Sequence, residues 1–297
     1  MVARRVLSAV AAAFALSAVQ ASAAITVADD RGATLVLEAP AARIVTLSPH
    51  LTELVYAAGA GTHLVAVPRY SDHPEAAQAL PQIGDATRVD LERVLALRPD
   101  LVLAWKSGNS AADIARLEQL GLRLHVSDAA RLADVARVVR AIGRLAGTEA
   151  AAERQAANFE SEIAALRARH AGSAPLRVFY QIWDRPLLTV NGAHIISDVL
   201  ALCGGENVFA GAALLTPAVS LEALIAARPD FVLGGSSALT PAEFAAQWRS
   251  HRVSAIARLP VRYVPPDLIQ RGTPRIAQGA AVICERLEEH RRSAGLR

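Results

Sequence analysis

A helix-and-strand sequence occurs twice in this chain, at residues 91–103 and again at residues 221–233. Each copy follows a polar capping residue, Asp90 or Ser220, and carries an apolar helical run that ends at Arg-Pro-Asp. Because a residue before proline disfavours the helical region, each helix is predicted to end there. The apolar stretch that follows does not alternate, which is typical of a strand covered on both faces. Two copies therefore predict an α/β protein of two similar lobes with central, mainly parallel sheets.

The lobes are expected at residues 24–146 and 172–297, with a linking helix at residues 147–171. The stretch from Thr148 to His170 contains no proline and places its larger apolar residues on one face. These features predict a single long helix between the lobes, with a ligand cleft between them. A single stiff connection also predicts small movements of one lobe relative to the other.

Residues 1–23 have the pattern of a signal peptide. Arg4 and Arg5 precede an apolar run, and Ala21-Ser22-Ala23 provides a small-residue cleavage site. The run is shorter than the roughly 18 apolar residues of a membrane span, and no cysteine near the cleavage site could carry a lipid. The sequence therefore predicts export to a bacterial periplasm as a soluble protein.

Charge gives no support to nucleic-acid binding. The whole chain of 297 residues has a formal net charge of +3, and the signal peptide carries two of its arginines and no acid. The mature surface is therefore close to neutral, and no basic run is interleaved with aromatic residues. We expect no nucleic-acid partner.

The chain has two cysteines, Cys203 and Cys284. An even number in an exported protein favours a disulfide, which here would close a long loop inside the second lobe. Two buried free thiols are the alternative. A metal site is disfavoured because the two residues lack the close spacing of metal-binding cysteines.

Candidate ligand contacts follow the carboxyl ends of the predicted strands, where open α/β sheets bind ligands. Trp105 and Trp183 fall at such ends, one in each lobe, and could hold a large flat ligand between them. Packing in the core is the alternative for each aromatic residue. The full candidate set is His50, Tyr70, Trp105, Trp183, Asp267 and Arg271.

His50 has two readings. A neutral imidazole binds cobalt and iron, so His50 could be an axial ligand of a metal inside the bound molecule. It could equally be a hydrogen-bonded loop residue. No protein metal site is predicted, because His50, His73 and the nearby acids lack the spacing of a metal-binding cluster.

Glu92 and Glu222 occupy matching places in the two copies of the repeat. A glutamate in the first helical turn suits the helix dipole, and this alone could explain both. The alternative is a two-point handle, one carboxylate on each lobe, for a basic partner.

Several stretches together resemble a known family; they are Arg43 to Pro49 with Thr52 to Leu54, Tyr70 to Asp72, Leu91 to Arg93, Pro99 to Val102 with Ala104 and Trp105, Cys203 to Asn207, and Pro274 to Ile276. The chain resembles the periplasmic solute-binding proteins that serve importers of vitamin B12, ferric siderophores and haem. In that class two α/β lobes are joined by one long helix. The similarity runs along nearly all of the mature chain and looks strongest to the vitamin B12-binding members.

The resemblance implies roles for matching residues. Glu92 and Glu222 occupy the places of glutamates that dock onto arginines of the permease dimer, and Cys203 and Cys284 match the disulfide of the family. Tyr70 and Trp105 match aromatic positions of the cleft, and Asp267 matches an acidic one.

The sequence departs from the vitamin B12-binding pattern in two places. Thr216 stands where these relatives have a tryptophan, and Leu268 stands where they have an aromatic residue. Trp183 could compensate from a neighbouring strand end.

The sequence thus predicts a monomeric periplasmic receptor that captures a corrinoid, vitamin B12, and delivers it to an inner-membrane ABC importer whose ATPase lies in another chain. Cobalamin would be the transported ligand, and no cofactor is expected. The alternatives are a ferric siderophore, for which Arg69, Arg185 and Arg271 could serve, and haem, whose iron Tyr70 or His50 could bind. An exported enzyme is disfavoured, because the chain has no nucleophile elbow, glycine-rich phosphate loop or metalloprotease helix.

Overall fold

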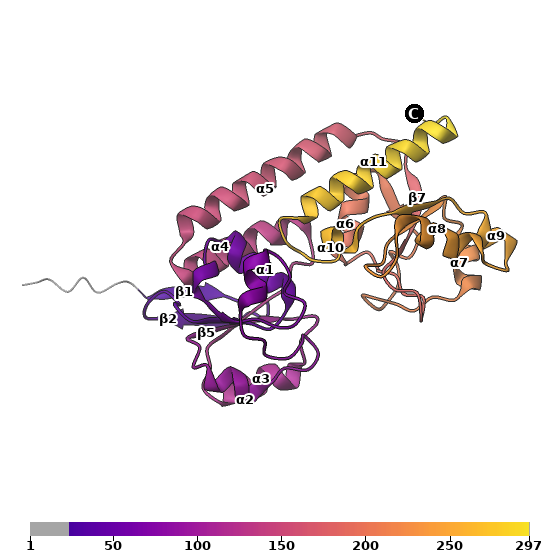
Figure 1. Cartoon of the computed structure of the whole chain (residues 1–297). Coiled ribbons are helices and arrows are strands. Elements are labelled where there is room, and N and C mark those ends of the chain that lie inside the picture. The colour runs from indigo at the N-terminus through magenta and orange to yellow at the C-terminus, as the bar shows by residue number, and fades with distance from the viewer. Residues whose placement is uncertain (1–23, 297) are drawn as a thin grey trace, which may run out of the picture.

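The computed structural model describes residues 24–296 and places them in two α/β lobes joined by one long helix (Figure 1). This confirms the predicted fold class. The predicted signal peptide lies outside the described residues. Within the described range, none of the helices combines the length and apolar character that a membrane crossing requires.

The N-terminal lobe is built on a parallel sheet in the order β4-β3-β5-β6, preceded by an antiparallel hairpin of β1 and β2. Its strands are β1 (Ile25–Ala28), β2 (Thr34–Leu37), β3 (Ile44–Thr46), β4 (Leu64–Ala66), β5 (Leu101–Trp105) and β6 (Leu124–Ser127). Its α-helices are α1 (Pro49–Ala57), α2 (Leu91–Ala96), α3 (Ala111–Gln119) and α4 (Leu132–Ala146), and η1 (Gly61–His63) and η2 (Glu75–Ala79) are short 3-10 turns.

The C-terminal lobe repeats this topology in a parallel sheet of order β10-β9-β7-β8. In both lobes the first strand of the sheet, β3 or β7, lies between the second and the third. The strands are β7 (Leu176–Gln181), β8 (Gly205–Asn207), β9 (Phe231–Gly234) and β10 (Val261–Tyr263). The helices are α6 (Ile195–Leu202), α7 (Leu221–Ala227), α8 (Pro241–Arg249), α9 (Ser254–Ala257), α10 (Pro266–Ile269) and α11 (Ile276–Ala294).

The repeated segments fold alike, as helix α2 with strand β5 and helix α7 with strand β9. Helix α2 ends at Ala96 and helix α7 at Ala227, just before the arginine of Arg-Pro-Asp. Both arginines, Arg98 and Arg228, adopt a left-handed conformation with φ of 45° and 46°. The following proline disfavours the right-handed helical region for these residues, so the chain turns sharply into the strand. The sequence predicted the helix end but not this turn conformation.

The aspartate of each repeat then ties the turn to the first strand of its sheet. The carboxylate of Asp100 accepts from the backbone N–H of Arg43 over 2.9 Å, and that of Asp230 accepts from the N–H of Arg177 over 2.6 Å. The guanidinium of Arg43 in turn donates to the carbonyl oxygen of Leu97 at the end of α2, and that of Arg177 donates to the carbonyl oxygen of Ala227 at the end of α7. The same contacts thus hold the repeat in place in both lobes.

Helix α5 (Glu149–His170) lies within the range predicted for the linking helix and packs against α4 and α11. Its buried face includes Ala152, Phe159 and Ile163, which belong to an apolar core that continues from one lobe into the other. Each lobe also has one smaller apolar cluster of its own, on the other side of its sheet from this shared core. The continuous core holds the lobes together on the α5 side, so any separation has to occur on the opposite side.

Cys203 and Cys284 form a disulfide, as predicted, with their Cα atoms 4.8 Å apart. The bond joins the end of α6 to α11, and both residues are buried in the shared core. It therefore fastens the C-terminal helix to the lobe that follows the linker.

Candidate ligand-binding cleft

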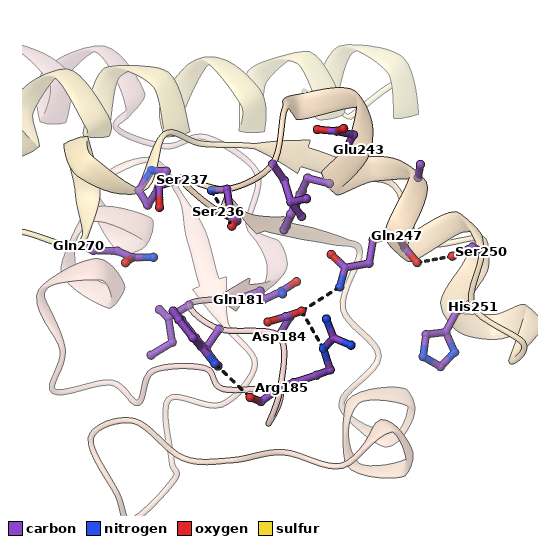
Figure 2. Close-up of a pocket in the computed structure, with 18 residues that line it drawn as sticks. Gln181, Asp184, Arg185, Ser236, Ser237, Glu243, Gln247, Ser250, His251 and Gln270 are labelled. Carbon is purple, nitrogen blue, oxygen red and sulfur yellow. Dashed lines mark hydrogen bonds and ion pairs between the residues drawn. The ribbon is translucent and has the colours of Figure 1, made fainter.

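A large pocket lies in the C-terminal lobe, beyond the carboxyl ends of β7 and β9, and has a volume of about 1030 Å³ (Figure 2). Its walls are the segments that follow these strands, together with α8 and Gln270. This is the edge at which parallel sheets bind ligands. The volume is at the upper end of the range for small-molecule sites, so the pocket suits a large ligand.

Trp183 is the aromatic platform of this pocket. Its side chain remains 60% exposed while its indole N–H donates to the carbonyl oxygen of Arg185 over 3.1 Å. That bond fixes the ring, so an exposed aromatic face is presented with little freedom left to lose on binding. Trp248, in contrast, is buried and donates to Gln181 over 2.7 Å, as expected of a packing residue.

The polar groups of this pocket are mostly uncharged. Arg185 is the one lysine or arginine among the 18 described residues that line it, and its guanidinium is paired with Asp184 over 3.3 Å. Asp184 also accepts from the side-chain amide of Gln247 over 3.2 Å (Figure 2). Glu243 caps α8 through the backbone N–H and the hydroxyl of Thr240. No unpaired cation is therefore offered by the described wall, whereas hydroxyl and amide groups come from Ser236, Ser237, Gln247 and Gln270.

A second, smaller cavity of about 70 Å³ lies between the lobes and shares Gln270 with the large pocket. His50, Trp105 and Asp128 line it from the N-terminal lobe, and His194 and Leu215 line it from the C-terminal lobe. The two predicted tryptophans are therefore not in one cavity. Trp105 borders the space between the lobes, while Trp183 borders the pocket of one lobe.

His50 lies at the start of α1 and packs edge-on against Trp105, with ring centroids 5.0 Å apart. Its Nδ1 atom shares a short hydrogen bond with the hydroxyl of Ser48. Burial, with a smaller effect of the nearby Arg271 charge, lowers the pKa of His50 to about 3. The indole N–H of Trp105 donates to Asp128 over 3.2 Å, which fixes the ring on the other side.

His194 is a site residue that the sequence analysis missed. It is the N-cap of α6, where its Nδ1 atom accepts from the backbone N–H of Ile196 over 3.2 Å. Burial lowers the pKa of His194 to about 4, so the ring is neutral. The signal was present, because His194 precedes the first helix of its lobe much as His50 begins the first helix of the other.

Arg271 does not face an open cleft but joins the two lobes. Its guanidinium donates to Glu53 in α1 and to Asp72 in the loop after β4, each over 2.7 Å. Glu53 is 4% exposed and also receives bonds from Thr273 and Arg275. The charge of Arg271 is thus already neutralised by acids of the other lobe.

The remaining predicted contacts lie at the rim. Tyr70 is 72% exposed and borders neither cavity. Asp267, at the start of α10, lies 3.7 Å from the guanidinium of Arg271. The carbonyl oxygen of Tyr70 accepts from Arg271 of the other lobe over 3.4 Å, while the Tyr70 ring stays in solvent.

Glu92 and Glu222 are exposed in the first turns of α2 and α7. Each helix is capped in the same way, since the side chain of Asp90 or Ser220 accepts from the backbone N–H three residues later. Figure 1 places α2 and α7 away from α5, on separate lobes. A hydrogen bond from its own backbone N–H, and next the Ser220 hydroxyl, lower the pKa of Glu222, which keeps that carboxylate ionised.

The sequence matches the periplasmic binding protein family over residues 44–267. The chain belongs to this family. It is 35% identical to the vitamin B12-binding protein of Vibrio parahaemolyticus over 253 residues, which are 85% of this chain and 92% of the relative. A vitamin B12-binding protein of Yersinia pestis is also 35% identical, over 254 residues.

Solved structures agree with this placement. The crystal structure of the periplasmic vitamin B12-binding protein BtuF of Vibrio cholerae superposes with a TM-score of 0.78 at 32% identity, covering 85% of this chain and 98% of that one. A periplasmic haem-binding protein from Roseiflexus sp. has a TM-score of 0.69 at 24% identity, covering 82% and 98%. The second likeness shows a shared fold.

Family membership confirms a binding protein rather than an enzyme. Among residues 24–296, no three histidine, cysteine or acidic side chains are grouped as a metal site requires. The cleft is therefore described by its shape, its aromatic surfaces and its hydrogen-bonding groups.

Proposed function

We propose that this chain is the periplasmic substrate-binding protein of an ABC importer and that it captures a corrinoid, vitamin B12. It acts as a monomer, with the corrinoid held at the carboxyl ends of the strands and contacted by both lobes. The relatives named for vitamin B12 support this ligand at 32–35% identity.

The large pocket carries the proposal, because most hydrogen-bonding groups of its described wall are uncharged and its one cation, Arg185, is paired with Asp184. Cobalamin is rimmed by neutral carboxamides, which pair with amide and hydroxyl groups. Haem carries propionate carboxylates, and burying a carboxylate without a cationic partner is costly. Arg271, a candidate partner for such an anion, is already paired with Glu53 and Asp72.

Other apolar side chains near the cleft would replace the aromatic surface that is lost where Thr216 and Leu268 stand in place of aromatic residues. Trp183 is exposed at the large pocket, and Leu215, next to Thr216, lines the cavity between the lobes. Tyr70 and Trp105 supply aromatic surface from the other lobe. A flat macrocycle buries such surfaces with little cost in side-chain ordering.

Glu92 and Glu222 are the proposed contacts to arginines of the permease. Both are exposed, one lies on each lobe, and their helices begin with equivalent caps. Charged pairs at such an interface set orientation and rate of encounter more than affinity.

The test is a parallel titration of the mature protein with cyanocobalamin, haem and a ferric hydroxamate, followed by calorimetry. The proposal predicts saturable one-to-one binding of cyanocobalamin and much weaker binding of the other two. Saturable binding of haem or of the iron chelate, without binding of cyanocobalamin, would mean that Thr216 and Leu268 mark a changed specificity.

A further inference from the structure

The cavity between the lobes contains two histidines, each at the N-terminal end of the first α-helix of its lobe. His50 is the second residue of α1, which follows β3, and His194 is the N-cap of α6, which follows β7. β3 and β7 hold the same place in the two sheets. The internal duplication thus brings one imidazole from each lobe to a single cavity of about 70 Å³.

The hydrogen bond to Nδ1 determines which nitrogen of His194 carries the proton. The backbone N–H of Ile196 donates to Nδ1, so this nitrogen carries a lone pair. A neutral imidazole has a single N–H, which must then be on Nε2. No other described residue bonds to this ring, so the N–H on Nε2 is free to donate to a bound molecule.

His50 has the same tautomer as His194. Ser48 is fully buried, and the one side-chain partner of its hydroxyl among residues 24–296 is Nδ1 of His50. The hydroxyl therefore donates to Nδ1, because otherwise its hydrogen would be buried without an acceptor. The N–H of His50 is then on Nε2 as well, which leaves no lone pair there for a metal.

The rest of the cavity favours a neutral partner for these donors. Asp128 lines it and accepts from Trp105 and Ser107 through one oxygen, while no lysine or arginine is among its described lining residues. A ligand carboxylate would meet the negative charge of Asp128 without a compensating cation. A primary carboxamide can accept from an imidazole N–H through its oxygen and donate to Asp128 through its nitrogen.

We infer that His50, His194 and Asp128 form a carboxamide subsite that holds one amide side chain of the corrinoid between the lobes. The inference rests on the proposed function. The cavity between the lobes has room for a few waters or one small polar group, but not for a macrocycle. The macrocycle itself would occupy the adjoining large pocket. The subsite selects an intact amide over the corresponding acid, and it replaces the reading of His50 as an axial ligand.

The experiment pairs two variants with matched ligands. His50→Asn and His194→Asn each keep an acceptor for the local partner, the Ser48 hydroxyl or the helix N–H, but have no atom where Nε2 lies. Cyanocobalamin is compared with its b-, d- and e-monocarboxylic acids, in each of which one amide has become a carboxylate.

The control is His290→Asn. It alters a histidine of α11 whose ring stacks on Phe231 of β9. Urea midpoints establish that every variant is folded.

The wild-type protein is expected to bind at least one of the three acids about tenfold or more weakly than cyanocobalamin. Each cleft variant should weaken cyanocobalamin binding by about three- to twelvefold, the effect of one uncharged hydrogen bond, and should weaken binding of that acid much less. The control should bind all four ligands as the wild type does.

Equal losses for all four ligands, or no loss, would overturn the subsite while leaving corrinoid capture in place. A shift of the cobalt absorption bands of aquocobalamin on the wild type that disappears in His50→Asn would show metal ligation, and would also overturn it. Absence of cyanocobalamin binding by the wild type would overturn both the subsite and the proposed function.

Discussion

Arg271 of the C-terminal lobe donates to Glu53 of the N-terminal lobe over 2.7 Å, and the Glu53 side chain is only 3% exposed. Thr273 and Arg275 bond to the same carboxylate. Three side chains of one short segment thus depend on a single acid of the opposite lobe, which makes this pair the main polar tie across the cleft.

Glu53→Gln should lower the free energy of unfolding by about 1–3 kcal/mol, because the guanidinium of Arg271 loses the negative charge of a buried partner but keeps Asp72. Urea denaturation measures the change. The control is Glu285→Gln, an acid that is 62% exposed and 3.9 Å from Arg286, for which about 0.5 kcal/mol or less is expected. Equal effects of the two variants would show that the inter-lobe pair has no special weight.

Acid should destabilise the protein through His50 and His194, whose pKa values lie at about 3 and about 4 in the folded chain. The unfolded chain takes up these protons near pH 6.5 and the folded chain does not, so stability falls as the pH drops from about 6.5 toward those values. Each imidazole contributes at most about 1.4 kcal/mol per pH unit. Urea midpoints between pH 6.5 and 4.5 should fall less steeply in the double variant His50→Asn with His194→Asn, and an unchanged slope would contradict the pKa assignment.

Replacing both cysteines, Cys203→Ala with Cys284→Ala, should lower stability by about 4–5 kcal/mol on the chain-entropy account. The bond closes a loop with a sequence separation of 81 residues, which removes freedom mainly from the unfolded chain. Thermal unfolding of the oxidised, the reduced and the double-variant protein measures this. The reduced wild type should resemble the variant; if reduction leaves the midpoint unchanged, the bond is not a major source of stability.

Glu92→Arg and Glu222→Arg should reduce delivery to the importer without changing corrinoid affinity, because both side chains lie on exposed helices away from the two cavities. We expect the association rate with the reconstituted permease to fall about tenfold for each, most strongly at low salt. Glu162→Arg, on the exposed face of α5, is the matched charge reversal. A similar loss with Glu162→Arg would argue for a general charge effect.

The sequence was sufficient to predict the fold, because the repeat at residues 91–103 and 221–233 marks the same helix, turn and strand in each lobe. It also placed His50, Trp105 and Trp183 at strand ends. It could not show that the two tryptophans border separate cavities, since this depends on how the lobes are oriented. The tie between Glu53 and Arg271 was hidden for the same reason, as the residues are 218 positions apart.

Calorimetric titration of cyanocobalamin into the wild-type protein and into Trp183→Ala tests whether the large pocket captures a corrinoid. The account predicts one-to-one binding to the wild type and about thirtyfold weaker binding to the variant, because Trp183 is the exposed aromatic wall of the large pocket. Absence of binding to the wild type, or equal affinity of both proteins, would contradict it.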